Sequence, residues 1–358
     1  MTTFNKITEF KNIEYSWKQT QRGDKKFKSD SIKFSFLLDT NLVQLWRSLK
    51  AGTYTMSNYV RFKVYEPKER VISAPRIRDK VVQFAVHEVI KDIYEPIFIK
   101  DNYACRPKKG THAAVQALQH YMRLCRWQYG DGWVVKLDVK KFFYSIDRST
   151  LKQILRKKIS CKRTLQLLDK IIDSSPEGAT GIPLGNVTSQ DFANIYMNEL
   201  DQYVKRCLGI KWYVRYMDDV IAVVETKDEA TDLLNKMVRF LNTRLKLDIN
   251  NKTKVFPLQQ GVNAYGFKIY TTHKLVRNSA KAGMKRRIKA MNRKLNNGEL
   301  PLRSLLQAVN SWLGHAKRSN SYNLCKKIFN KYPYVDIENK GGLFYGDILR
   351  TDRTGRPI

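Results

Sequence analysis

The fold is decided by residues 212–224, WYVRYMDDVIAVV. Two strongly apolar runs flank a polar centre at Met217, Asp218 and Asp219, which predicts a β-hairpin with the acids near its turn. Adjacent carboxylates between apolar strands repel each other, and a divalent cation would relieve that repulsion. A second apolar run, 133–139 (WVVKLDV), predicts a central strand that ends near Asp138. Asp138 is therefore the expected third carboxylate.

Three carboxylates suit two Mg²⁺ ions about 3.5–4 Å apart, with Mn²⁺ as an alternative ion. Such a pair of ions would activate an attacking 3′-hydroxyl and stabilise a pyrophosphate leaving group. The simpler interpretation of the Asp218–Asp219 pair is a turn dipeptide, because aspartate favours turns. The residues around the pair decide between the two interpretations.

The overall charge points to a polyanionic partner. The 358 residues include 66 Lys and Arg against 33 Asp and Glu, a formal net charge of +33. Contacts with phosphates release counterions and favour binding to nucleic acid. No apolar run reaches about 18 residues, and residues 1–20 lack the apolar core of a secretory signal, so we expect a cytoplasmic protein with no membrane partner. The five cysteines are scattered without a C-x-x-C pair, which argues against zinc or a disulfide framework.

Periodicity predicts a mixed helix and strand protein. Residues 1–30 are polar with little periodicity. Helices are expected at 42–49, 79–98, from about 111, and at 151–174, 189–206, 229–245, 281–294, 302–312 and 322–329. Strands are expected at 59–65, as a half-buried strand, and at 264–271. The last stretch, from 331, is polar.

The motifs around the acids resemble those of reverse transcriptases. Residues 216–219 (YMDD) resemble the YxDD motif, 134–146 (VVKLDVKKFFYSI) the first catalytic block, and 181–190 (GIPLGNVTSQ) the template-positioning block. Residues 70–83 and 102–118 resemble fingers blocks of group II intron and other bacterial enzymes, while 247–255 and 264–269 resemble later palm blocks. The order and spacing match over 42–329, nearly the whole chain.

The resemblance implies an α+β right-hand polymerase with a small antiparallel palm sheet and a helical thumb. We expect an N-terminal extension at 1–41, fingers at 42–132 and 151–174, and palm at 133–150 and 175–271. The thumb would be 272–330, followed by a tail at 331–358.

The resemblance also assigns catalytic roles. Asp138 and Asp218 would bind the metals together with the Val139 carbonyl, and Asp219 would be a neighbouring, less essential carboxylate. Lys252 matches the lysine that protonates departing pyrophosphate, with Lys254 as the competing choice.

Nucleotide contacts are expected from Arg70 and Gln190, with Lys63 and Lys68 as weaker candidates. Phe143 matches the steric gate that excludes a ribose 2′-OH, whereas Phe142 is expected to pack in the core. The template and primer residues implied are Gly181, Ile182, Pro183, Gly185, Arg106, Tyr265, Gly266, Phe267, Lys285, Arg286 and Lys289. Arg106 would support either the fingers or the template, and the last three belong to a basic thumb helix whose alternative role is a solvated face.

Residues 109–112 (KGTH), the S-Q ending of 181–190 and residues 311–322 (SWLGHAKRSNSY) resemble the reverse transcriptases of diversity-generating retroelements. That subclass implies an RNA template copied with errors opposite adenine, a DNA or RNA primer, dNTPs, an RNA–DNA duplex and a small basic oligomeric accessory protein. A loose fit around Ile182, Gln190 and Arg70 is the hypothesis for infidelity. The alternatives are an abortive-infection or other defence polymerase, and a non-catalytic RNA-binding protein with a polymerase fold.

Overall fold

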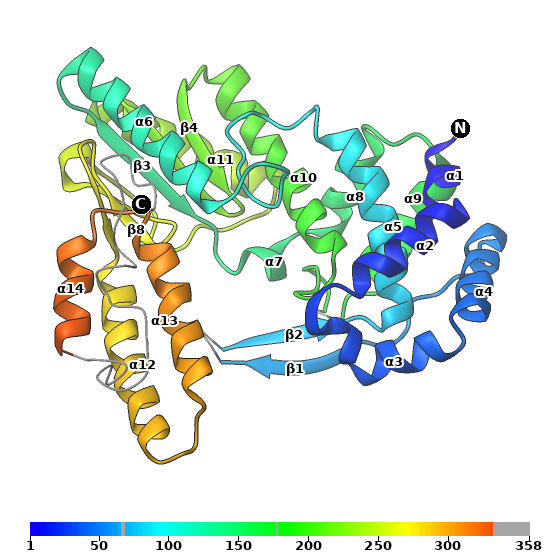
Figure 1. The fold of residues 1–358 in the computed structure, drawn as a ribbon. Coiled ribbons are helices and arrows are strands. Elements are labelled where there is room, and N and C mark those ends of the chain that lie inside the picture. The colour runs from blue at the N-terminus through cyan, green and yellow to red at the C-terminus, as the bar shows by residue number, and fades with distance from the viewer. Residues whose placement is uncertain (66–68, 177, 332–358) are drawn as a thin grey trace. The chain divides into compact units, whose positions relative to one another are not determined.

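A computed structural model describes residues 1–65, 69–176 and 178–331 of the chain (Figure 1). The chain divides into two compact units. The first contains residues 1–118 and 133–256, and the second contains 119–132 and the chain from 257 onward. Most of the expected fingers and palm thus share the first unit, whereas residues 119–132 of the expected fingers and 257–271 of the expected palm fall in the second. The first unit ends at residue 256 and not at residue 271. The strands within 257–271 belong to a separate three-stranded sheet, which lies in the same unit as the expected thumb helices.

The first unit contains a four-stranded sheet with the strand order β4-β5-β3-β6. Its strands are β3 (Trp133–Asp138), β4 (Trp212–Tyr216), β5 (Asp219–Val224) and β6 (Lys254–Pro257). Strand β5 is buried along nearly its whole length and pairs antiparallel with both β3 and β4. Helix α11 (Lys227–Arg244) packs against β3 and β5. The predicted hairpin and small antiparallel palm sheet are confirmed.

Helix α10 (Thr188–Gln202) runs through the centre of this unit and continues into a π-helical turn, η2 (Tyr203–Cys207). It packs against α5 (Ile77–Tyr94), α8 (Arg148–Arg156) and α11. The helix expected at 151–174 is two helices, α8 and α9 (Lys162–Asp173). The chain turns between them so that their apolar faces, including Leu155 and Leu168, pack together in the core.

The N-terminal residues are more ordered than their weak periodicity indicates. They form α1 (Thr3–Ile7), α2 (Phe10–Thr20), η1 (Gly23–Phe27), α3 (Ser29–Phe36) and α4 (Leu38–Ala51). Phe4, Ile7, Ile13 and Trp17 are buried in the core, and α2 packs along α5. The helices α1, α2 and α3 are too short to show a long apolar stripe, so their burial depends on tertiary contacts, whereas α4 contains the helix predicted at 42–49.

A two-stranded antiparallel hairpin, β1 (Val60–Val64) and β2 (Arg70–Ala74), stands apart from the main sheet (Figure 1). The expectation of a half-buried strand at 59–65 is wrong in its burial, since every residue of β1 is exposed. The alternation of residue types predicts the strand, but within residues 1–65, 69–176 and 178–331 no further strand pairs with the hairpin to form a covered sheet.

The second unit combines a three-stranded antiparallel sheet with helices. Its elements are α6 (Thr111–Tyr129, from residue 119), η3 (Leu258–Gln260), β7 (Val262–Ala264), β8 (Phe267–Ile269), β9 (Lys274–Val276), α12 (Asn278–Asn296), α13 (Leu302–Ala316) and α14 (Tyr322–Lys331). The single strand expected at 264–271 is a hairpin, because Tyr265 and Gly266 both adopt positive φ and reverse the chain. Met284 and Ile288 are buried on α12, as its stripe predicts. All but the first residue of the predicted 331–358 tail lies outside the described residues.

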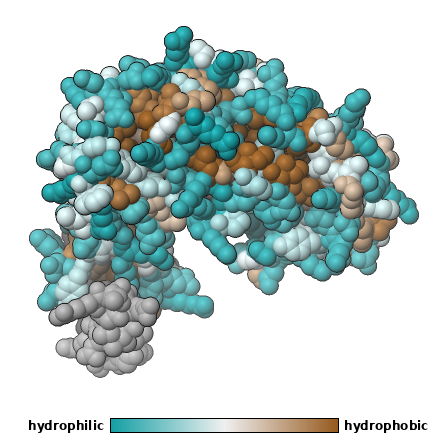
Figure 2. Space-filling view, turned by 90° about the horizontal axis from the view of Figure 1, so that it is seen from above, coloured by the Kyte–Doolittle hydropathy of each residue, from teal (hydrophilic) through white to brown (hydrophobic). Residues whose placement is uncertain are grey.

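Hydrophilic residues cover most of the face drawn in Figure 2, with hydrophobic patches between them. Among the helices that the structure describes, none combines the length and apolarity needed to cross a membrane.

Candidate active site

The acidic pair lies at a two-residue turn between β4 and β5. Tyr216 and Asp219 are paired across the hairpin, so Met217 and Asp218 alone form the loop. Met217 has a φ of 53°, a left-handed conformation that costs a non-glycine residue about 1–2 kcal/mol. The tight turn places Asp218 at the tip and Asp219 at the first position of β5.

Strand β3 brings the third carboxylate to the same edge. Asp138 is directly opposite Asp219 in the β3–β5 register. Side chains at directly paired positions project from the same face, with Cβ atoms about 4.5–5.5 Å apart. The structure therefore brings together the three acids that the sequence singles out.

Charge repulsion is visible at Asp218. Burial, together with the neighbouring charges of Asp219 and Asp138, raises the pKa of its carboxyl to about 6, while Arg70 opposes them. Lys136 forms an ion pair with Asp219, with Nζ 3.8 Å from Oδ1. A largely buried carboxyl beside two other carboxylates is suited to binding a cation.

The backbone of Asp138 is anchored by the segment 248–253. Its carbonyl accepts a hydrogen bond of 2.7 Å from the Asn250 amide, and its own amide donates to Thr253 Oγ1 at 3.2 Å. Val139 forms an isolated bridge with Ile249. Two backbone hydrogen bonds flank this bridge, from the Asn250 amide to the Asp138 carbonyl and from the Lys140 amide to the Asp248 carbonyl. Neither of them uses the Val139 carbonyl, which is the one assigned to a metal.

The same segment carries the two candidate lysines for proton donation. Lys252 is exposed, two residues after Asn250, and its amide donates to the Asn250 side chain. Lys254 lies on β6 with Nζ over the Phe256 ring, 5.0 Å from its centroid. This contact holds Lys254 against an aromatic ring, which favours Lys252 as the mobile candidate.

The donor set fits Mg²⁺, since carboxylate and carbonyl oxygens are its preferred ligands. Asp138, Asp218, Asp219 and the Val139 carbonyl would hold the ions. Over residues 1–65, 69–176 and 178–331, no three or more His, Cys, Asp or Glu side chains are grouped closely enough to hold a metal ion. The acids thus share one edge of the sheet without enclosing a preformed cage.

The two adjacent phenylalanines have different environments. Both belong to α7 (Phe142–Ser145). Phe142 is 3% exposed within the core, as its expected packing role requires, whereas Phe143 is only partly buried. The Phe143 carbonyl accepts a 2.8 Å hydrogen bond from the Ile182 amide. This bond ties the gate candidate to the template block.

Two glycines let the template block approach other backbone segments. Gly185 has a φ of 132°, and a Cβ there would lie 2.6 Å from the Ser73 carbonyl oxygen of β2. At Gly181, with a φ of 88°, a Cβ would lie 2.8 Å from the Tyr144 carbonyl oxygen. A side chain fits at neither position. The block is therefore packed between the fingers hairpin and α7.

The side chains of this block point to different environments. Gln190 is exposed in the first turn of α10, as a nucleotide or template contact requires. Pro183 and Ile182 are buried, and Ile182, at 1% exposure, belongs to the core. The Ile182 side chain is therefore not accessible to a nucleotide, so it does not contribute to the loose fit expected around Gln190 and Arg70.

The fingers candidates also differ. Arg70 is exposed at the start of β2 and lies close enough to Asp218 to lower its pKa. Lys63 forms an exposed ion pair with Glu69 at 2.8 Å, and Lys68 lies outside the described residues. Arg70 is thus the candidate that the structure connects with the acids.

Arg106 is engaged inside the protein. Its guanidinium group donates to both Glu95 oxygens and to the carbonyls of Ile99 and Asn102, at 2.7–3.1 Å. Its side chain is only 7% exposed. These contacts favour support of the fingers over direct contact with the template.

The second unit contains the expected primer-grip and thumb residues. Tyr265 and Gly266 form the β7–β8 turn, and Phe267 stacks on His315 with ring centroids 4.3 Å apart. A Cβ at Gly266 would lie 2.7 Å from the His315 ring. Lys285, Arg286 and Lys289 are all exposed on α12, away from its buried Met284 and Ile288.

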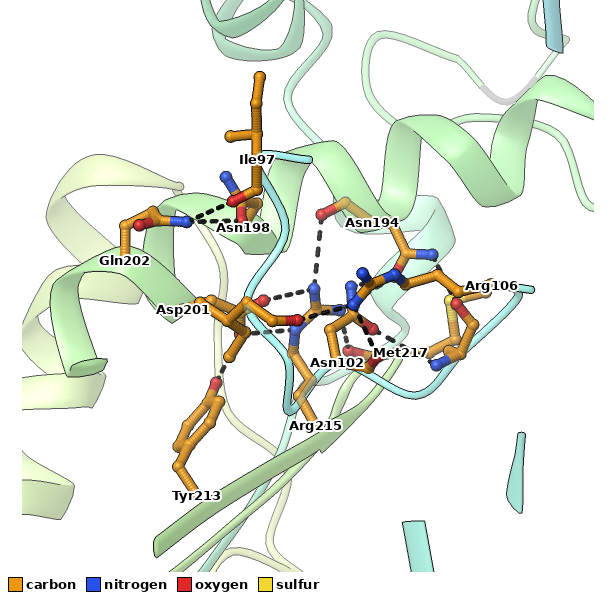
Figure 3. A network of polar contacts seen from close by, with 12 residues as sticks. Ile97, Asn102, Arg106, Asn194, Asn198, Asp201, Gln202, Tyr213, Arg215 and Met217 are labelled. Carbon is orange, nitrogen blue, oxygen red and sulfur yellow. Dashed lines mark hydrogen bonds and ion pairs between the residues drawn. The ribbon is translucent and has the colours of Figure 1, made fainter. Parts of the chain in front are cut away.

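The sequence patterns missed a buried polar network beside the acidic turn. Arg215 of β4 and Asp201 of α10 form an ion pair whose side chains are both fully buried, and Asn194 joins them (Figure 3). A signal was present in the motif WYVRY, because Tyr213 and Arg215 lie on one face of an otherwise apolar strand. A buried arginine requires a counter-ion.

Comparisons with known proteins agree with the motifs. The family model described as "Reverse transcriptase (RNA-dependent DNA polymerase)" matches residues 63–269. The chain is 27% identical to "Protein YkfC" of Escherichia coli K12 over 292 residues, covering 69% of this chain and 75% of that protein. It is 28% identical to "Group II intron-encoded protein LtrA" of Lactococcus lactis over 227 residues, or 61% of this chain. That match spans only 36% of the LtrA sequence.

The fold is similar to that of apo telomerase from Candida tropicalis, with a TM-score of 0.50 and 10% sequence identity. The similarity covers 77% of this chain and 59% of the telomerase chain. The matched family region contains both β3 with Asp138 and the Asp218–Asp219 turn. The chain therefore belongs to the reverse transcriptase family.

Proposed function

We propose that the chain is an RNA-directed DNA polymerase that extends a DNA or RNA primer with dNTPs along an RNA template. The observation that carries this proposal is the position of Asp138 directly opposite Asp219, with Asp218 at the adjoining turn. The raised pKa of Asp218, which burial and these two neighbouring charges cause, supports the proposal. Carboxylates that share one edge of a sheet can become the ligands that a two-metal nucleotidyl transferase needs once the ions bind.

Two Mg²⁺ ions, or Mn²⁺ in their place, would lower the pKa of the attacking 3′-hydroxyl and stabilise the pyrophosphate leaving group. Arg70 would bind the triphosphate through its planar guanidinium group. The Phe143 ring would clash with a ribose 2′-OH and so exclude ribonucleotides. Lys252 would donate a proton to departing pyrophosphate.

The product duplex would be bound by the exposed basic face of α12. Lys285, Arg286 and Lys289 lie on this face, and seven Lys or Arg occur between 281 and 294 without an acidic residue. Such a helix can follow a phosphate backbone. The excess of basic residues over the whole chain supports an RNA template and an RNA–DNA duplex as partners.

Within this function, the enzyme of a diversity-generating retroelement is the subclass we propose. Residues 109–112 and 311–322 support it. Errors opposite adenine would arise near the exposed Gln190 and Arg70, since Ile182 is buried. Sequencing cDNA copied from an adenine-rich RNA tests this subclass, and faithful copying at adenine would contradict it. Purification from the native host should also yield a small basic oligomeric partner.

The central test is primer extension by the purified protein with a defined RNA template, dNTPs and Mg²⁺. Asp218→Asn should abolish extension and leave RNA binding within about twofold, because it removes one negative charge and no basic contact. Asp173→Asn is the matched control, since Asp173 forms a surface ion pair with Lys152 on α8. Addition of nucleotides without a template would support a defence-type polymerase. RNA binding without any extension would support a non-catalytic binding protein.

A further inference from the structure

The acidic turn is backed by a fully buried ion pair. Arg215 Nε donates to Asp201 Oδ1 at 2.7 Å, and Arg215 Nη2 donates to Asp201 Oδ2 at 2.6 Å. Both side chains have 0% exposure. A buried ion pair often stabilises a protein no better than well-packed apolar residues would. Its presence here therefore calls for a role beyond stability.

The same guanidinium group also holds the turn itself. Arg215 Nη1 donates to the Met217 carbonyl at 3.0 Å (Figure 3). Met217 is the residue with positive φ, and its carbonyl belongs to the peptide bond that leads into Asp218. Fixing this carbonyl fixes the plane of that peptide, and with it the direction in which Asp218 leaves the backbone. The guanidinium thus compensates an unfavourable conformation next to a proposed metal ligand.

The guanidinium group is itself held from several sides. Asn194 Oδ1 accepts from Arg215 Nη1 at 3.2 Å, and the Tyr213 hydroxyl donates to Asp201 Oδ1 at 2.8 Å. The Arg215 backbone is fixed as well, because its amide donates to the Asp101 carbonyl and its carbonyl accepts from the Tyr103 amide, both at 2.9 Å. With two planar hydrogen bonds to Asp201, the guanidinium has little freedom to rotate away from the turn.

We propose that Arg215 is a positioning residue that holds the Met217–Asp218 peptide so that Asp218 points towards the metal position, and that Asp201 fixes Arg215 for this purpose. The inference rests on the proposed polymerase function for its consequence on catalysis. It assigns Arg215 and Asp201 no contact with substrate or metal. Their effect passes through the backbone of the turn.

Arg215→Lys keeps the charge but loses the planar group that reaches Asp201 and Met217 together. In primer extension we expect kcat to fall at least tenfold, with the KM for dNTP within about twofold. Mn²⁺ affinity, measured by electron paramagnetic resonance on the metal-free protein without nucleic acid, should weaken at least threefold. Circular dichroism should show the same helix and strand content as the unmodified protein.

Met217→Gly in the Arg215→Lys background is the decisive variant. Glycine adopts positive φ without strain, so the turn then needs less support. We expect this second change to restore at least a third of the lost Mn²⁺ affinity and kcat. A role of Arg215 in general packing would give no such rescue, because removing the Met217 side chain adds no contact.

A milder pair of variants covers the case in which Arg215→Lys does not fold. Tyr213→Phe removes the 2.8 Å hydrogen bond to Asp201, and Tyr54→Phe removes a 2.8 Å hydrogen bond to Asp79 that is equally buried but away from the turn. We expect Tyr213→Phe to lower kcat and Mn²⁺ affinity at least twofold and Tyr54→Phe to leave both unchanged. Equal effects of the two variants would overturn the inference, as would full kcat and Mn²⁺ affinity in Arg215→Lys. If the unmodified protein extends no primer, the proposed function fails, and the Mn²⁺ comparison still decides the positioning role.

Discussion

Replacing Asp218 with asparagine should stabilise the metal-free protein while it abolishes polymerisation. Burial, with the charges of Asp219 and Asp138, raises the pKa of Asp218 from 3.8 to about 6. Each pH unit of such a difference corresponds to ~1.4 kcal/mol, so ionised Asp218 costs the folded protein at most about 3 kcal/mol. The side chain is partly exposed, and solvent screening reduces this cost. We therefore expect Asp218→Asn to raise the free energy of unfolding by about 1–3 kcal/mol at pH 8.

The gain should depend on pH in a defined direction. A carboxyl whose pKa is raised by folding favours the folded state below its unfolded value of 3.8, and this advantage is lost as the pH rises through about 6. The cost of ionising Asp218, which burial and the neighbouring charges cause and which asparagine removes, is thus absent in strong acid and complete above about pH 7. The stability gained by Asp218→Asn should be largest at pH 8 and fall to roughly half at pH 5.

Urea unfolding in the presence of a chelator, at pH 5 and pH 8, measures both quantities. Adding Mg²⁺ at pH 8 should stabilise the unmodified protein more than the variant, since the ion binds the carboxylate. Asp173→Asn serves as control and should give no gain, because it removes a surface ion pair worth about 0–1 kcal/mol. A metal-free Asp218→Asn protein that is no more stable than the unmodified chain at pH 8 would refute the electrostatic argument.

Three further outcomes follow from the geometry of the first unit. Phe143→Ala should raise incorporation of ribonucleotides relative to deoxynucleotides at least tenfold in primer extension; unchanged selectivity would remove Phe143 as the gate. Gly185→Ala should lower the free energy of unfolding by about 1–3 kcal/mol more than Gly178→Ala. Both glycines have positive φ, but of the two only Gly185 has a backbone oxygen 2.6 Å from the added Cβ. Equal losses in urea unfolding would contradict this. Asp147→Ala should cost about 1 kcal/mol at pH 7 by removing the N-cap of α8. Burial raises the pKa of Asp147, but hydrogen bonds from the first turn of α8 outweigh it and hold this pKa well below its usual value. The loss of stability in Asp147→Ala should therefore shrink as the pH falls below about 4. A loss that grows in acid would be inconsistent with the cap.

The sequence predicts the palm hairpin well because its signals are local. Apolar runs on both sides of Met217–Asp218 define two strands, and a two-residue turn leaves little freedom in their register. The run that ends at Asp138 is apolar apart from Lys136, which indicates a neighbouring central strand. The sequence pattern does not indicate that Asp138 and Asp219 are paired. The register between β3 and β5 in the structure shows this pairing.

Burial of individual side chains could not be predicted in the same way. Ile182 lies in a glycine-rich block that resembles a template contact, yet its side chain enters the core. Strand β1 alternates like a half-buried strand, yet it is exposed throughout. In both cases the outcome depends on which distant elements cover the segment, and local alternation contains no information about them.

Arg215 and Asp201 show the same limit for polar pairs. They lie 14 residues apart, on a strand and a helix. An arginine on a buried strand predicts a counter-ion, but several acidic residues of the preceding helix are candidates for it. Only the packing of α10 beside β4 selects Asp201, and it also selects Asn194 as the second acceptor.

The costs around the turn between β4 and β5 have one feature in common. Glycine at 217 would remove the backbone strain, asparagine at 218 would remove the cost of a buried charge beside two others, and well-packed apolar residues at 215 and 201 together would remove the need to bury an ion pair. Stability would favour all three changes, so stability does not explain the residues present. An oriented, ionisable carboxylate at 218 explains the residues at all these positions. Crowded negative charge attracts a cation, and the buried arginine fixes the backbone from which that carboxylate projects. The unfavourable features of this turn are therefore the strongest structural argument that it is a catalytic one.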